Sequence, residues 1–180
     1  MGLLVNMFRS AVEALLLSSL LTCLACSPAD SNFPPHPTDA ALEKNFREHR
    51  GEFEELLGMY AQDSQTVVAI THNLTRLESN RDWPRPDSEI GISAERWNEY
   101  RRLFKLLDIN EGVSRVPETG VLLFSVSSSG TALDSVTKGY AYSQRKLEPT
   151  TDSLDQIPLN LLTGKPVYKR LEGNWYLYFW

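Results

Sequence analysis

Two neighbouring segments carry residue types that can perform acyl chemistry. Three consecutive hydroxyls, Ser127–Ser129, stand before Gly130, and Lys138 follows soon after. A serine attacks a carbonyl carbon when a base takes its proton, and a buried lysine with a lowered pKa can serve as that base. A glycine turn between two strands would bring these segments side by side. The same residues also suit an ordinary solvated hairpin loop, and the sequence leaves both interpretations open.

Other catalytic and metal-binding templates find no match in the sequence. It contains no G-x-S-x-G elbow, no H-E-x-x-H, no phosphate loop and no dinucleotide fingerprint. The histidines His36, His49 and His72 are separated by a predicted tether and a predicted helix, so a shared metal would require His36 to fold back. Several carboxylates fall in predicted loops: Asp63, Asp82, Asp87, Glu89, Asp134, Asp152 and Asp155. They are either solvated turn residues, which is the simpler interpretation, or they include a catalytic pair. The sequence therefore predicts no catalytic residue, no metal site and no cofactor.

An apolar run near the N-terminus predicts the compartment. Residues 14–25 form a mostly apolar run, but this run is too short for a bilayer core, which needs roughly 20 helical residues. It has the length of a signal-peptide core, and Arg9 supplies a weak positive segment before it. We therefore predict a signal peptide over residues 1–25.

The end of this run, Leu24-Ala25-Cys26, resembles the lipobox of bacterial lipoprotein precursors. The resemblance implies that Cys26 is acylated and becomes the new N-terminus, and that Ser27 after it directs the protein to the outer membrane, facing the periplasm. Several acyl chains on one residue anchor a protein stably. An ordinary secretory peptide cut near Ala25 and an uncleaved anchor are the alternatives.

Composition limits the partners of the mature chain. The chain of 180 residues is 42% hydrophobic and 23% charged, as expected of a globular protein. Its net charge of −5 gives no electrostatic footprint for nucleic acid. The two cysteines are Cys23, in the predicted leader, and Cys26. The mature domain would then fold without disulfides, by packing alone.

The elements that must position any site follow from periodicity. Residues 26–38 are rich in Pro and Ser and predict a flexible tether before a single domain over residues 39–180. Apolar residues at helical spacing predict one helix over 39–60, capped by Thr38 or Asp39, and a second over 94–107, capped by Ser93. Short alternating or apolar runs predict strands at residues 66–71, 113–116, 121–127, 137–143, 167–171 and 175–179. We predict an α+β fold in which two amphipathic helices pack on an antiparallel sheet of about five strands. The strand at residues 66–71 is expected at an edge of the sheet or between the helices and the hairpins.

The C-terminal strand has aromatic side chains on both of its faces. One face would carry Trp175, Leu177 and Phe179, and the other Tyr176, Tyr178 and Trp180. Either the strand is central and covered, or these side chains form an exposed face that binds a protein, a glycan or a peptidoglycan strand. The segments KGYAYS and NWYLY are similar to segments of small uncharacterised proteobacterial lipoproteins, and this resemblance implies no activity.

The sequence favours a membrane-anchored envelope lipoprotein that binds a protein or cell-wall partner and is not an enzyme. An alternative is a periplasmic immunity or inhibitor lipoprotein that masks a toxin or hydrolase, since an acidic domain can steer a basic partner. A second alternative is a Ser- or carboxylate-dependent hydrolase.

Overall fold

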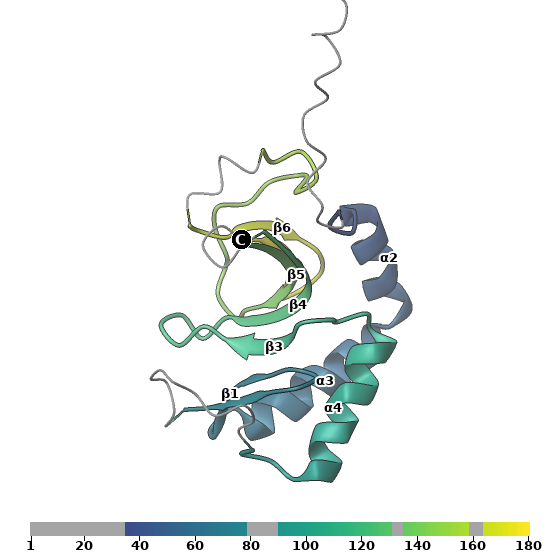
Figure 1. Cartoon of the computed structure of the whole chain (residues 1–180). Coiled ribbons are helices and arrows are strands. Elements are labelled where there is room, and N and C mark those ends of the chain that lie inside the picture. The colour runs from purple at the N-terminus through teal and green to yellow at the C-terminus, as the bar shows by residue number, and fades with distance from the viewer. Residues whose placement is uncertain (1–34, 79–89, 131–134, 159–163) are drawn as a thin grey trace, which may run out of the picture. The chain divides into compact units, whose positions relative to one another are not determined.

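Three helices and seven strands make up the described part of the chain, residues 35–78, 90–130, 135–158 and 164–180 of this computed structural model. The elements are α2 (Asp39–Glu48), α3 (Arg50–Asp63), β1 (Val67–Ile70), β2 (Thr75–Leu77), α4 (Ala94–Leu106), β3 (Gly112–Arg115), β4 (Leu122–Ser129), β5 (Val136–Tyr142), β6 (Val167–Arg170) and β7 (Trp175–Phe179). Figure 1 shows their course along the chain.

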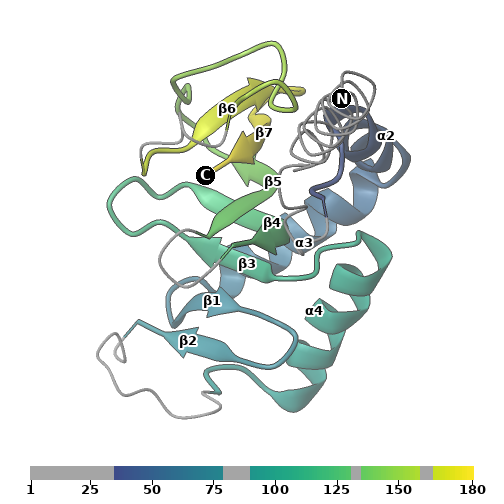
Figure 2. The same cartoon turned by 45° about the horizontal axis from the view of Figure 1, so that its top comes forward.

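The strands form one antiparallel sheet in the order β2-β1-β3-β4-β5-β7-β6. The predicted α+β class is confirmed, but the predicted number of about five strands is too low. The strand predicted at residues 66–71 lies inside the sheet, and the unpredicted β2 pairs with its outer side (Figure 2). At three residues β2 is too short to show the alternation by which strands are recognised in a sequence.

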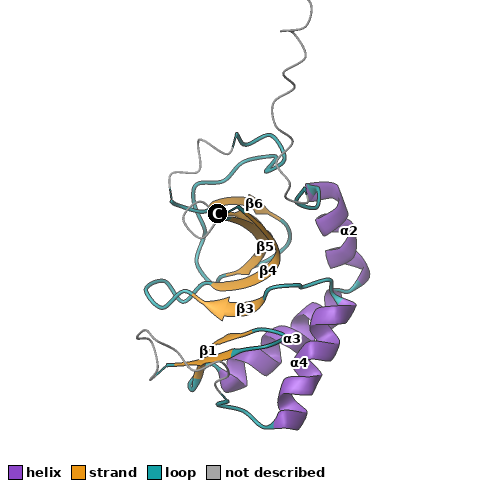
Figure 3. Cartoon of the chain, in the orientation of Figure 1, coloured by secondary structure: helices purple, strands orange, loops and turns teal. Residues whose placement is uncertain are grey.

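The single helix predicted over residues 39–60 is wrong, because the chain forms two helices there. The break is at His49, whose φ of −121° and ψ of 30° are not helical. An unbroken helix through Asp63 would be a straight rod of about 37 Å, whereas two shorter helices can each follow the curved sheet (Figure 3). The predicted caps are confirmed: Thr38 accepts from the N–H of Ala41, and Ser93 accepts from the N–H of Arg96.

The three helices pack on one face of the sheet. Phe46 of α2 and Phe53 of α3 meet Tyr140 and Trp175 of the sheet, with ring centroids 4.6–6.1 Å apart. Tilted and edge-on aromatic pairs at this separation add to the free energy of burial. The main core therefore fixes the position of α2 over β5 and β7.

A second, smaller core covers the other face of the sheet. It includes Tyr176 and Tyr178 of β7, Leu123 of β4, and Leu147 from the connection after β5. All five residues of β7 are buried, and β7 lies between β5 and β6. Of the two interpretations of this strand, the covered strand therefore describes β7, and the exposed aromatic face does not.

The predicted signal peptide, the acylation site Cys26 and most of the tether lie outside the described residues. The compact unit begins at Pro35, four residues before the predicted domain boundary at residue 39. Within the described ranges, no helix combines the length and the hydropathy that a membrane span requires.

Candidate functional site

The candidate site lies on the helix-covered face of the sheet, where three strands place their side chains in one row. Ser127 of β4 is paired with Lys138 of β5, and Lys138 is paired with Phe179 of β7. A bulge in β4 between Ser125 and Ser127 sets this register. Opposite the bulge stands Gly139, where a Cβ atom would strike the carbonyl oxygen of Phe124. The glycine of KGYAYS is thus required by the close approach of β4.

Lys138 is buried in this row, with 2% of its surface exposed. Its Nζ lies 2.8 Å from Asp39 Oδ1 and 2.5 Å from Asp155 Oδ1. The contact with Asp155 is a directed hydrogen bond, whereas the contact with Asp39 is an ion pair without hydrogen-bond geometry. The described polar contacts of Lys138 are thus with carboxylates, and none is with the serines. This arrangement suits a fixed cation and does not suit the base that a Ser–Lys pair needs.

Asp39, the first residue of α2, is the buried partner in this cluster. Its Oδ2 accepts the N–H of Leu154 at 2.8 Å and lies 3.4 Å from Lys169 Nζ. Burial alone would raise the pKa of the Asp39 carboxyl, but the ammonium of Lys138, the Leu154 N–H and the charge of Lys169 outweigh it and lower that pKa. The carboxyl therefore remains ionised inside the protein.

Asp155 occupies the N-terminus of α2. The backbone N–H of Asp39 donates to both of its carboxylate oxygens, at 3.1 and 3.0 Å. A carboxylate at this place satisfies a free amide and complements the positive end of the helix dipole. The side chain of Asp155 remains 38% exposed, while that of Lys138 is 3% exposed. Asp155 is therefore the charge that solvent reaches.

His36 joins the site from the segment before α2. Its Nδ1 lies 2.7 Å from Ser127 Oγ and its Nε2 lies 2.7 Å from Ser129 Oγ. The ring also meets Phe179 edge-on, with centroids 5.2 Å apart. Burial first, and then the charge of Lys138, lower the pKa of the imidazole. In the neutral ring one nitrogen donates to a serine and the other accepts from the second serine.

These groups border a cavity of about 390 Å³. Its lining combines apolar side chains with a few polar groups: His36, Thr38, Lys138, Leu154, Asp155, Ile157 and Phe179. Small-molecule sites generally have this size and this combination of apolar walls with few placed polar groups. The residues come from the segment before α2, from β5, from the segment after residue 150 and from β7.

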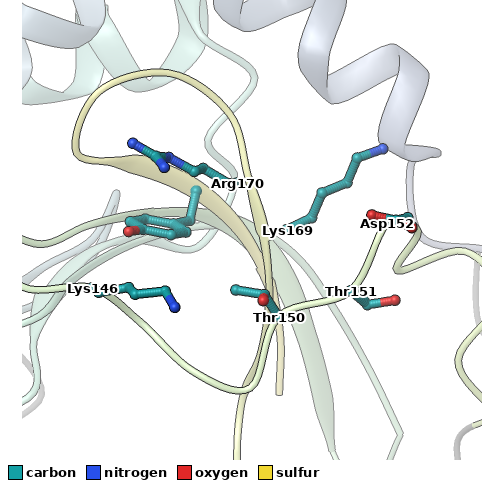
Figure 4. Close-up of a pocket in the computed structure, with 7 residues that line it drawn as sticks. Lys146, Thr150, Thr151, Asp152, Lys169 and Arg170 are labelled. Carbon is teal, nitrogen blue, oxygen red and sulfur yellow. The ribbon is translucent and has the colours of Figure 1, made fainter.

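A second cavity, of about 440 Å³, lies beside β6 and the segment that pairs with its edge (Figure 4). Its three cations do not converge on one point. Lys169 extends toward α2, where it lies 2.8 Å from Glu43, and Lys146 lies 2.7 Å from Glu148. Arg170 is exposed on β6 and points away from Lys169. A site for an anion would need these charges to meet, so this cavity is the weaker candidate.

A third, open groove of about 580 Å³ runs between α3, the β3–β4 turn and the end of β5. Leu57 and Leu122 contribute apolar surface, and Arg145 lies at its edge. Its other arginine, Arg115, lies 2.8 Å from Glu78. Among the described residues that line this groove, the polar side chains do not converge as those of the His36 cavity do.

The structure brings together only part of what the sequence singled out. Ser127 and Ser129 lie near Lys138 on paired strands, but their imidazole partner His36 was assigned to a flexible tether. No local pattern could reveal this contact, because more than 90 residues separate His36 from the serines. His49 is at the helix break and His72 Nε2 lies 3.0 Å from the carbonyl oxygen of Ile109.

The predicted binding residues Trp175, Tyr176 and Tyr178 are buried, with at most 4% of their surface exposed. Trp180 is 39% exposed, and its Nε1–H donates to the carbonyl oxygen of Gly164. The three buried aromatic residues belong to the two cores and present no open face. Among the described residues, no group of three or more His, Cys, Asp or Glu side chains is placed to hold a metal ion.

Comparison of the chain with protein-family models, with curated proteins and with solved structures found no match.

Proposed function

We propose that this protein is a lipid-anchored lipoprotein of the bacterial envelope, without enzymatic activity, whose domain binds a small ligand or a protruding group of a cell-wall or protein partner. The cavity beside His36, Lys138 and Asp155 is the binding site in this proposal. The observation that carries it is the combination of apolar walls and fixed polar groups around one cavity of about 390 Å³.

The polar groups of the cavity are held in place before any ligand arrives. Lys138 lies between two carboxylates, Asp155 accepts the Asp39 N–H, and His36 lies between two serines. Groups fixed in this way lose little conformational entropy on binding, which favours affinity. The same contacts direct the Lys138 side chain to two carboxylates and not to the serines, and this supports a binding role.

The anchor is tested by the intact mass of the protein from isolated membranes. We expect a species that begins at Cys26 and carries added acyl mass, and the variant Cys26→Ala should lack both the cleavage and the added mass. A soluble, unacylated protein cut elsewhere would remove the anchor and leave an exported domain.

The binding site is tested by thermal unfolding of the full-length protein with a library of small amphipathic fragments. Fragments that bind the folded state raise the midpoint, and the increase grows with the logarithm of the fragment concentration once this exceeds the Kd. The variant Ile157→Trp, which fills the cavity, should abolish these shifts, and Leu57→Trp in the groove beside α3 should preserve them. Equal shifts in both variants would place binding elsewhere.

A serine-dependent hydrolase is the second candidate, because His36 contacts two serine hydroxyls at 2.7 Å. A histidine at this distance can take the proton of an attacking serine. The second nitrogen meets another hydroxyl, however, and not the carboxylate that usually stabilises a charged imidazole. Labelling by a fluorophosphonate that Ser127→Ala or Ser129→Ala abolishes would favour this candidate, and absence of labelling in the wild type would remove it.

The inhibitor alternative has less support from the described surface. Acidic residues of the helices alternate with basic ones in ion pairs, as in Glu55 with Arg102 and Asp63 with Arg96. An electrostatically steered inhibitor would instead gather its acids in one patch.

A further inference from the structure

We propose that the cavity beside His36 accepts a primary ammonium group on an aliphatic stem. This inference rests on the binding role proposed above and adds the chemical class of the ligand. It follows from which charge of the cavity a ligand can reach, from how the helix terminus is occupied, and from the chemistry of the walls.

The reachable charge is negative. Among the described residues that line the cavity, Lys138 and Asp155 are the two with charged side chains. The Lys138 side chain is 3% exposed and lies against Asp39, while the Asp155 side chain is 38% exposed. A ligand that enters from solvent therefore meets a carboxylate, and the ammonium of Lys138 stays behind it. A cationic group gains from this contact, whereas an anionic group is repelled.

The helix terminus, which would otherwise attract an anion, is already filled. Both carboxylate oxygens of Asp155 accept the first N–H of α2, so Asp155 is itself the anion at this terminus. A carboxylate or phosphate ligand would have to displace Asp155 and also separate it from Lys138. An ammonium can bind without breaking either contact. Oδ1 of Asp155 accepts from the Asp39 N–H and from Lys138 Nζ, but Oδ2 accepts the Asp39 N–H and keeps a second acceptor position.

The walls suit an aliphatic stem. Leu154, Ile157 and Phe179 give the cavity its apolar surface, and each buried methylene of a ligand contributes about 0.8 kcal/mol before other terms. The imidazole of His36 has a lowered pKa and is therefore neutral near pH 7, so it does not oppose a cation. Thr38 adds a hydroxyl at the rim.

The test compares n-pentylamine, 1-pentanol and pentanoate, which share a stem and differ in the head group, as ligands of the full-length protein at pH 7. Dissociation constants are measured from NMR shifts of the Ile157 methyl groups. We expect pentylammonium to bind at least about tenfold more tightly than either of the other probes. Asp155→Asn should remove the preference, and Asp152→Asn, an acid outside this cavity, should retain it.

The outcomes separate this inference from the binding role. Binding of pentanol or pentanoate with equal or higher affinity would overturn the ammonium class and leave the cavity as a binding site. Silence of all three probes, together with no response to the fragment library, would overturn both. Should Asp155→Asn fail to fold, Ile157→Trp replaces it with the Leu154 methyl groups as the NMR reporter, and the proposal then requires that pentylammonium binding is lost.

Two sources in a cell envelope carry this group, the ethanolamine head of a phospholipid and a lysine-type side chain of a peptide. A short-chain phosphatidylethanolamine and Nα-acetyl-lysine amide distinguish them as competitors of pentylammonium. Stronger competition by either one supports the ammonium class and identifies the source. Failure of both to compete would contradict it.

Discussion

Replacement of Lys138 by methionine tests the buried charge cluster on which the candidate site is built. The change removes the ammonium but keeps most of the side-chain volume. Removal of one partner of a buried ion pair costs about 3–5 kcal/mol, because the other charge stays buried. Asp39 retains the Leu154 N–H and Lys169, and Asp155 is partly exposed to water. We therefore expect a loss near the lower limit, about 3 kcal/mol of unfolding free energy.

The assay is urea unfolding of the full-length protein followed by circular dichroism. For a domain of this size the expected loss corresponds to a decrease of roughly 6–12 °C in Tm. The matched control is Lys146→Met, because the Lys146–Glu148 pair is almost fully solvated and its removal should leave the midpoint unchanged. In the double variant Lys138→Met/Asp39→Leu, the loss of unfolding free energy should be smaller than the sum of the two single losses by at least about 1 kcal/mol.

Equal stability of Lys138→Met and Lys146→Met would show that the buried charge cluster does not stabilise the fold. Additive losses in the double variant would also contradict a stabilising cluster, because they would show that Lys138 and Asp39 do not interact.

Three further predictions concern the same region. The Asp39 pKa is lowered below its ordinary 3.8, so the ionised carboxyl stabilises the fold above pH 3.8, and this stabilisation is lost as the pH falls through the folded pKa. In Asp39→Asn the unfolding free energy, measured in urea, should fall less across that range. The His36 pKa is lowered below 6.5, so the unfolded chain takes up the proton first and stability falls as the pH decreases from 6.5 to the folded pKa; unfolding in urea at pH 7.5 and 5.5 should show a smaller difference in His36→Gln. Gly139→Ala should cost more than 2 kcal/mol in urea unfolding because its Cβ would meet the Phe124 carbonyl, while Gly58→Ala, in open space on α3, should add about 0.5–1 kcal/mol; equal effects would contradict the bulge argument.

The helix caps and most strands could be predicted because their signals are local. Thr38 and Ser93 precede apolar residues at helical spacing, and a side-chain oxygen at that place satisfies a free N–H of the first turn. The break at His49 could not be predicted, because the apolar period continues through it from Phe46 to Phe53. The two helices on either side of the break each place a phenylalanine against Tyr140, and this tertiary packing is not recorded in the local period.

The candidate site was predictable only where a hairpin brings its residues together. Ser127 and Lys138 lie on paired strands joined by a short connection. Asp155 and Asp39 are 116 residues apart, and no spacing in the sequence links them. The aromatic pattern of β7 is compatible with a covered strand and with an exposed one, because the second core includes Leu147 from a connection that is distant in the sequence.

The most direct measurement of the central claim is the location of ligand binding by methyl NMR of the full-length protein during the fragment titration. We expect the methyl groups of Leu154 and Ile157 to shift and saturate together, while those of Leu57 and Leu122 in the groove beside α3 stay unchanged. Shifts confined to Leu57 and Leu122, or no shift at either place, would contradict the assignment of the binding site to the cavity of His36, Lys138 and Asp155.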